Sequence, residues 1–145
     1  MTTIAYRNGI LAADTGVYSN GFCEARVSKI RKVLAGLVGS SGNASHFKQF
    51  YTWVATNSER DRPKLDREDS FDGIHVKPDG SIFIYDRFMV AIPIHNTEFY
   101  ALGSGREIAM GAMAMGAAPA EAIRIACRFD THSIEPIETV SLSED

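Results

Sequence analysis

An Asn-Gly dipeptide near the start of the chain constrains the fold more than any other feature of the sequence. Asn8 and Gly9 separate two short runs in which apolar residues recur. Asn-Gly between such runs predicts a β-hairpin with a two-residue type I′ turn, because both residues tolerate a positive φ. A two-residue loop also fixes the strand register, so we expect Thr3 to lie opposite Asp14. The hairpin therefore returns Asp14 to the beginning of the chain.

The composition limits the classes of protein to consider. A length of 145 residues predicts a single domain over 1–145 that is long enough to bury a core. The formal net charge of −3 argues against nucleic acid as a partner, and no apolar stretch is long enough to cross a bilayer. The N-terminal residues lack the pattern of a signal peptide, and Cys23 and Cys127 form no Cys-x-x-Cys pair. We therefore expect a cytoplasmic protein with no nucleic acid and no membrane partner.

The rest of the chain mixes strand and helix patterns. Apolar residues at helical spacing predict a helix over 43–56, and two further helices are expected over 104–117 and 118–129. The segment 58–70 is charged, contains a proline and predicts a surface connection, while the run 25–42 predicts two short strands broken near residues 32 and 33. With strands expected at both ends of the chain, this order predicts a layered α+β domain.

Several polar residues have an ordinary structural interpretation when each is taken alone. Lys29 belongs to a basic run that fits a solvated strand edge. Ser104 and Glu107 have the S-x-x-E spacing of a helix capping box. Asp130 and Ser133 fit a turn that follows a helix. Taken singly, none of these residues indicates a catalytic site.

Taken together, short motifs in a fixed order carry a family resemblance. They are Thr-Thr-Ile at 2–4, Ala-Asp at 13–14, Val-Ser-Lys-Ile at 27–30, Ala-Gly-Leu-Val-Gly at 35–39 and Leu-Gly-Ser-Gly at 102–105. In this order the chain resembles the proteasome β-subunit group of N-terminal nucleophile (Ntn) hydrolases, and within it HslV, as a short, divergent bacterial or phage member. The D-x-x-S pattern at 130–133 is similar to that of proteasome β subunits. The resemblance implies a four-layer αββα sandwich with two antiparallel sheets between helical layers, although the family's second long helix is missing from 58–70.

The resemblance implies that Thr2 is the catalytic nucleophile once Met1 has been removed. A threonine hydroxyl needs a neighbouring base. The free α-amino group of Thr2 titrates near pH 8, so a fraction on the order of a tenth is neutral at pH 7 and can accept the hydroxyl proton. Lys29 matches the family's lysine, which would lower the pKa values of this amine and hydroxyl. Asp14 matches the aspartate that pairs with that lysine.

Further roles are carried over from the same resemblance. Gly39 matches the glycine whose N–H group stabilises the oxyanion. Ser104 matches the serine that hydrogen-bonds near the nucleophile's amine, and Asp130 and Ser133 match the pair that supports this amine. No cofactor is implied for the reaction. A structural Na⁺ or Mg²⁺ is implied at the backbone carbonyls of Cys127, Asp130 and Ser133.

The implied function is that of a threonine-type endopeptidase that cleaves unfolded polypeptides inside a homo-oligomeric ring. A specificity pocket is implied near residues 20, 31, 45 and 49. The resemblance to HslV also implies an AAA+ unfoldase ATPase as a partner. This chain carries no G-x-x-x-x-G-K-[ST] motif, so any nucleotide dependence would come from that partner.

Two alternatives stay open at this point: an inactive ring or scaffold homologue, and an Ntn amidohydrolase that acts on a small molecule. Five candidate residues argue against loss of activity, namely Thr2, Asp14, Lys29, Gly39 and Ser104. The Thr-Thr-Ile start and the surroundings of Lys29 favour a peptidase over an amidohydrolase.

Overall fold

The computed structural model describes residues 2–143, so the predicted removal of Met1 lies outside the described residues. The strands of this range are β1 (Thr3–Arg7), β2 (Ile10–Asp14), β3 (Gly16–Ser19), β4 (Phe22–Arg26), β5 (Ile30–Val33), β6 (Gly36–Gly42), β7 (Phe71–Val76), β8 (Ile82–Tyr85), β9 (Ile92–Ile94), β10 (Phe99–Gly103) and β11 (Ile137–Ser141). The helices are α1 (Phe47–Thr56), α2 (Arg106–Ala114) and α3 (Pro119–Phe129), with short 3₁₀ turns at Ala44–His46 and Glu59–Asp61.

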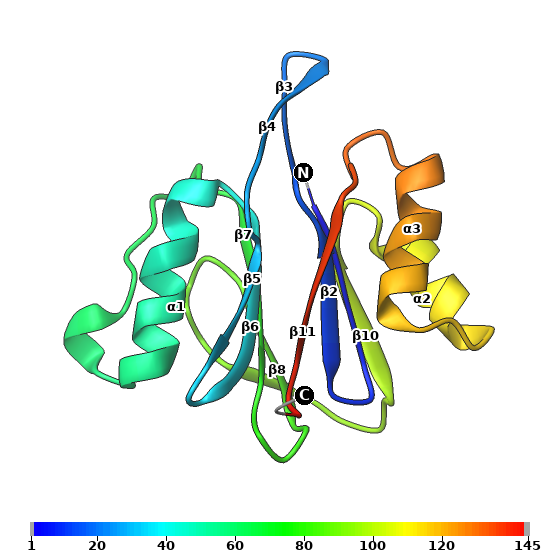
Figure 1. The fold of residues 1–145 in the computed structure, drawn as a ribbon. Helices are drawn as coiled ribbons and strands as arrows, with labels where there is room; N and C mark the ends of the chain where they lie inside the picture. The colour runs from blue at the N-terminus through cyan, green and yellow to red at the C-terminus, as the bar shows by residue number, and fades with distance from the viewer. Residues whose placement is uncertain (1, 144–145) are drawn as a thin grey trace.

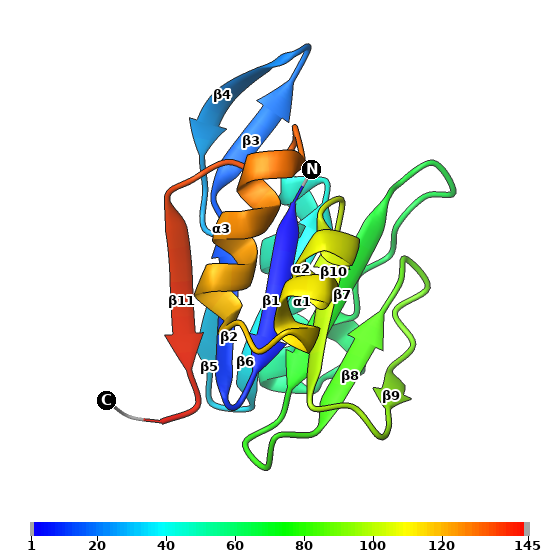
Figure 2. The same cartoon turned by 90° about the vertical axis from the view of Figure 1, so that its right-hand side faces the viewer.

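Most strands form two antiparallel sheets that face each other. One has the order β10-β1-β2-β11 and the other the order β5-β6-β7-β8-β9. Figure 1 shows α1 on the outer side of the five-stranded sheet, and α2 and α3 on the outer side of the four-stranded sheet. The β3–β4 hairpin forms a separate two-stranded ribbon that projects beyond both sheets (Figure 2). This mixed arrangement of helices and antiparallel sheets is consistent with the predicted α+β class.

The alternation of side chains along the strands produces separate layers of core. Between the sheets, Ile4 and Leu11 pack with Ile74 and Val76. On the other face of the four-stranded sheet, small residues bring α2 and α3 close to the strands; the cluster there includes Ala5, Ala12, Ala101, Met113 and Ile123. A third, aromatic cluster packs α1 against the five-stranded sheet. The N-terminal strand is therefore covered on both faces.

The predicted N-terminal hairpin is confirmed. Asn8 and Gly9 have φ values of 51° and 80°, as a type I′ turn requires. Ile4 pairs with Ala13, which is the predicted register. The turn thus places the β2 end that carries Asp14 beside the first residues of the chain.

The structure differs from the sequence-based expectations in some local details. The break between β5 and β6 falls after Val33, at residues 34–35, because the tight turn there uses Gly36 with a φ of 124°. The segment 58–70 contains only the 3₁₀ turn Glu59–Asp61, as the charged pattern predicted. Within the described range no helix is long and apolar enough to cross a membrane.

Candidate active site

A buried ion pair joins the end of β2 to the segment before β5. The Lys29 Nζ atom lies 3.1 Å from both carboxylate oxygens of Asp14 and donates to Gly16 O at 2.6 Å. The side chains are 2% and 0% exposed, respectively. Burial lowers the pKa of Lys29, and the charge of Asp14 offsets part of that effect. A cation whose pKa is lowered in this way is suited to act on a neighbouring amine or hydroxyl.

Backbone hydrogen bonds hold the Asp14 carboxylate in place. Its Oδ1 atom accepts the Thr3 N–H at 3.0 Å, and its Oδ2 atom accepts the Ile134 N–H at 2.9 Å. A buried charge is tolerated when its remaining lone pairs are satisfied, as they are here. Asp14 therefore connects Lys29 with the N-terminal strand and with the segment that leads into β11.

The N-terminal strand brings Thr2 to the same place. The Ser104 N–H donates to Thr2 O at 2.7 Å, which fixes the backbone of Thr2 against the end of β10. Gly103 permits this approach, since a Cβ atom there would lie 1.8 Å from Thr2 O and its φ is +99°. Thr2 is 2% exposed and lines a cavity of about 270 Å³ together with Lys29 and Gly42.

A second cluster of candidate residues surrounds Asp130. Its Oδ2 atom accepts hydrogen bonds from Ser104 Oγ at 2.7 Å and from Ser133 Oγ at 2.5 Å. Burial raises the pKa of Asp130, but these two hydrogen bonds together with the interactions of His132 hold the pKa below its usual value. The structure thus brings together Ser104, Asp130 and Ser133, which are separated in the sequence.

The capping interpretation of Ser104 is wrong. The residue before the first turn of α2 is Gly105, and no side chain caps this helix. The Ser104 hydroxyl instead donates to Asp130, 26 residues further along the chain. The S-x-x-E spacing was therefore coincidental.

The structure separates the two glycines of the segment 39–42. Gly39 pairs with Ile30 and Ile74 in the middle of the sheet, and a Cβ atom there would meet Ile4 at 3.2 Å. It lies in the core between the sheets and does not line the Thr2 cavity. Gly42, at the end of β6, does line that cavity. The geometry therefore does not place Gly39 at the cavity that Thr2 lines, whereas it places Gly42 there.

The structure does not place the predicted specificity residues in the lining of the Thr2 cavity. The Thr2 cavity is bounded by residues 16–19, Glu24, Val27, residues 42–44 and Phe47. None of residues 20, 31, 45 and 49 lines it. Ser45 and Gln49 line a separate cavity along α1.

The predicted cation ligands are backbone carbonyls, and the residues that carry them lie together. Cys127, Asp130 and Ser133 do line one cavity, of about 520 Å³. However, the Asp130 carboxylate is committed to two serine hydroxyls, and Asp130 O accepts the Ser133 N–H at 3.4 Å. Among residues 2–143, no group of three His, Cys, Asp or Glu side chains is placed to hold a metal. We assign no chemical step to a cation.

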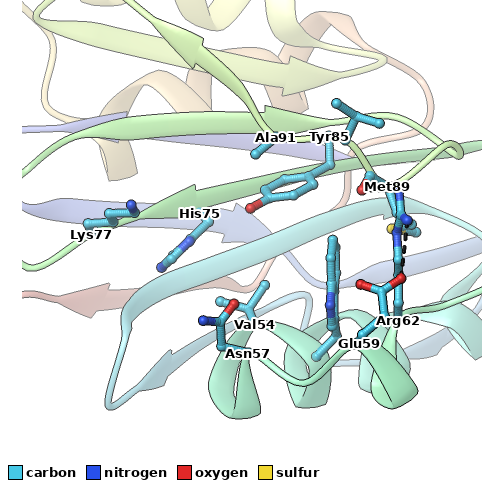
Figure 3. Close-up of a pocket in the computed structure, with 11 residues that line it drawn as sticks. Val54, Asn57, Glu59, Arg62, His75, Lys77, Tyr85, Met89 and Ala91 are labelled. Atoms are coloured by element: carbon cyan, nitrogen blue, oxygen red, sulfur yellow. Dashed lines mark hydrogen bonds and ion pairs between the residues drawn. The ribbon is translucent and has the colours of Figure 1, made fainter.

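A further cavity, of about 450 Å³, lies between α1 and the strands β7 and β8. In Figure 3, Val54 and Asn57 face Tyr85 and His75 across it. His75 Nε2 is 2.8 Å from Ala35 O, and burial lowers the pKa of this imidazole. Although this cavity is larger than the one at Thr2, its lining contains no serine, threonine or cysteine that could act as a nucleophile. The Thr2 cavity is therefore the better candidate for catalysis.

The architecture is that of HslV-type proteins. A solved structure titled "Thiobacillus denitrificans BPH" superposes with a TM-score of 0.68 at 22% identity, over 99% of this chain and 99% of that chain. A structure of the same protein in complex with epoxomicin gives 0.69 at 22% identity, over 98% of each chain. Eukaryotic HslV from Trypanosoma brucei gives 0.65 at 16% identity, over 97% of this chain and 98% of that chain. None of the protein-family models matches the chain, and no curated protein does. At these identities the likeness shows a shared fold.

Proposed function

We propose that this protein is a threonine-type endopeptidase with the αββα architecture of Ntn hydrolases and with Thr2 as its nucleophile after removal of Met1. One observation carries the proposal: Thr2 lines a cavity together with Lys29, whose buried ammonium is held by Asp14. A buried cation beside Thr2 favours loss of the proton from its hydroxyl, which a nucleophile needs at neutral pH.

The first half of the reaction forms an ester on Thr2. The free α-amine accepts the hydroxyl proton as Oγ1 attacks the peptide carbonyl carbon, and the C=O π electrons move onto oxygen. The tetrahedral intermediate then collapses, the C–N bond breaks, and the ammonium returns its proton to the departing amine. Lys29 favours the deprotonated forms of both groups electrostatically.

Gly42 is the proposed oxyanion donor. The Ser40 N–H points toward the β5 side of the strand, where it donates to Lys29 O at 3.1 Å. Peptide groups two residues apart point to the same side of a strand, so the Gly42 N–H is directed to that side as well. The segment before β5 leaves the sheet before it reaches Gly42, since the Val27 N–H donates to Thr15 O instead of to β6. We therefore propose that the Gly42 N–H, at the border of the cavity that Thr2 also lines, stabilises the oxyanion.

The second half of the reaction hydrolyses the ester. The amine takes a proton from water, hydroxide adds to the ester carbonyl, and the acid leaves as Oγ1 regains the proton. The cavity beside Thr2 accepts one side chain of the substrate, with Val17 and Phe47 as its apolar walls and Glu24 as its acidic residue. We propose unfolded polypeptides as substrates, a homo-oligomeric ring as the assembly and an AAA+ unfoldase as a partner.

The test combines intact mass with peptide hydrolysis. We expect the purified protein to lack Met1, to cleave fluorogenic peptides, and to lose this activity in the Thr2→Ala variant. An inactive scaffold would cleave nothing even without Met1. An amidohydrolase would act on small amides but not on peptides, and undiminished peptide cleavage by Thr2→Ala would refute the mechanism. Native mass spectrometry then separates a ring from a monomer.

A further inference from the structure

Thr3, next to the proposed nucleophile, lies at the junction of the two clusters described above. Its side chain is fully buried in β1. Its backbone N–H donates to Asp14, while its Oγ1 atom accepts the Gly105 N–H at 3.0 Å and lies 2.5 Å from Ser133 Oγ. Thr3 is therefore bonded to the ion pair through its backbone and to the Asp130 cluster through its side chain.

The direction of the hydrogen bonds around Thr3 follows from counting hydrogens. The Asp130 carboxylate is ionised at neutral pH and only accepts, so Ser133 donates its single hydroxyl hydrogen to Asp130. The hydrogen shared by Thr3 and Ser133 must then come from Thr3. The result is a one-way chain from the Gly105 N–H through the Thr3 and Ser133 hydroxyls to the carboxylate. Bonds in such a chain polarise and strengthen one another.

The same carboxylate also acts on Thr2 through Ser104. The Ser104 hydroxyl donates to Asp130, and the Ser104 N–H donates to Thr2 O. A rotation of the Asp130 carboxylate would therefore move Ser104, whose N–H holds the Thr2 backbone. Thr3 holds Ser133 and Asp130 from the side away from the cavity. The space around its hydroxyl is tight, because a Cβ atom on Gly105 would lie 2.2 Å from Thr3 Oγ1.

We infer that Thr3 is a positioning residue, whose hydroxyl holds Ser133 and Asp130 in the orientation that stabilises the charged α-amine of Thr2. The inference rests on the proposed function. Valine has the shape of threonine but neither donates nor accepts, so Thr3→Val leaves the Gly105 N–H and Ser133 without their partner. Serine keeps the hydroxyl. Comparing Thr3→Val with Thr3→Ser therefore separates the effect of the lost hydrogen bonds from the effect of altered packing.

The experiment measures kcat, KM and the pH profile of kcat/KM on a fluorogenic peptide. We expect Thr3→Val to lower kcat about tenfold or more with little change in KM, since misplaced catalytic groups slow the chemical step. A less well held carboxylate stabilises the ammonium less, so the acid limb of the profile moves to lower pH. Thr3→Ser should restore both properties.

The matched control is Thr15→Val. Thr15 is also buried, and its hydroxyl donates to Pro136 O at 2.7 Å, outside the chain that leads to Asp130. We expect this control to lose a similar amount of thermal stability while keeping kcat within about threefold of wild type. If Thr3→Val does not fold, Thr3→Cys replaces it, and its weakly bonding thiol should give an intermediate kcat.

The outcomes distinguish the inference from the function on which it rests. A wild type without Met1 that cleaves no peptide refutes the peptidase function. An active wild type combined with an equally active Thr3→Val variant refutes only the role of Thr3. The same holds if Thr3→Val loses activity without a shift of the acid limb, or if Thr15→Val loses as much activity, because the effect is then one of stability.

Discussion

Replacing Lys29 by methionine tests the buried ion pair directly. Methionine preserves most of the packing of the lysine stem but leaves the Asp14 charge without a cation. Loss of one partner from a buried pair costs about 3–5 kcal/mol. Asp14 keeps the Thr3 and Ile134 N–H donors in the variant, so we expect the lower end, about 3 kcal/mol. For a chain of this length, that loss lowers Tm by about 10 °C.

The assay is chemical denaturation with thermal melting of wild type, Lys29→Met, the double variant Lys29→Met/Asp14→Asn and the control Lys48→Met. Lys48 is exposed on α1, so its replacement should change the free energy of unfolding by less than about 0.5 kcal/mol. The double variant should recover part of the loss, because it no longer contains an uncompensated charge. A Lys29→Met variant within about 1 kcal/mol of wild type would show that the pair is not buried as described.

The remaining predictions concern glycine and pH. Gly42→Ala places a Cβ atom 2.1 Å from Ser70 O at a φ of +115°, so it should lower the Tm strongly and reduce any hydrolysis; unchanged melting would contradict the geometry. Gly111→Ala, in α2 where an added Cβ meets nothing within 4 Å, should instead stabilise the fold by about 0.5–1 kcal/mol. Because the pKa of Asp130 is lowered in the folded state, its carboxylate contributes stability above the unfolded pKa that is lost as the pH falls through the folded one. Asp130→Asn should therefore melt below wild type at pH 7 and approach it in strong acid; an equal gap in melting temperature at every pH would refute this.

Local patterns predicted a large part of the fold. The Asn8–Gly9 turn needs only positive φ values at two residues, and its register follows from the length of the loop. Pro119 lies in the first turn of α3, where its missing N–H costs nothing and marks the start of the helix. The separate β3–β4 ribbon was not predicted as such, because its position depends on contacts far away in the sequence.

The sequence identified most residues of the candidate site, but it did not show how these residues are arranged in space. Gly39 and Gly42 look alike in the sequence, and only the pairing of Gly39 with Ile30 and Ile74 shows which one lies inside the sheet. Thr3 was not recognised as a site residue. Strand alternation places its side chain on the helix-facing side of β1, but its partner Ser133 is 130 positions away.

The central claim is that Thr2 is a nucleophile activated by its own free amine. Its most direct test is intact mass spectrometry and peptide mapping after incubation with epoxomicin, the compound bound in one of the similar structures. We predict one covalent adduct per chain, located on Thr2, in protein that lacks Met1, and none in protein that retains Met1 or carries Thr2→Ala. Protein without Met1 that forms no adduct and hydrolyses no peptide, or an adduct that persists in Thr2→Ala, would contradict the account.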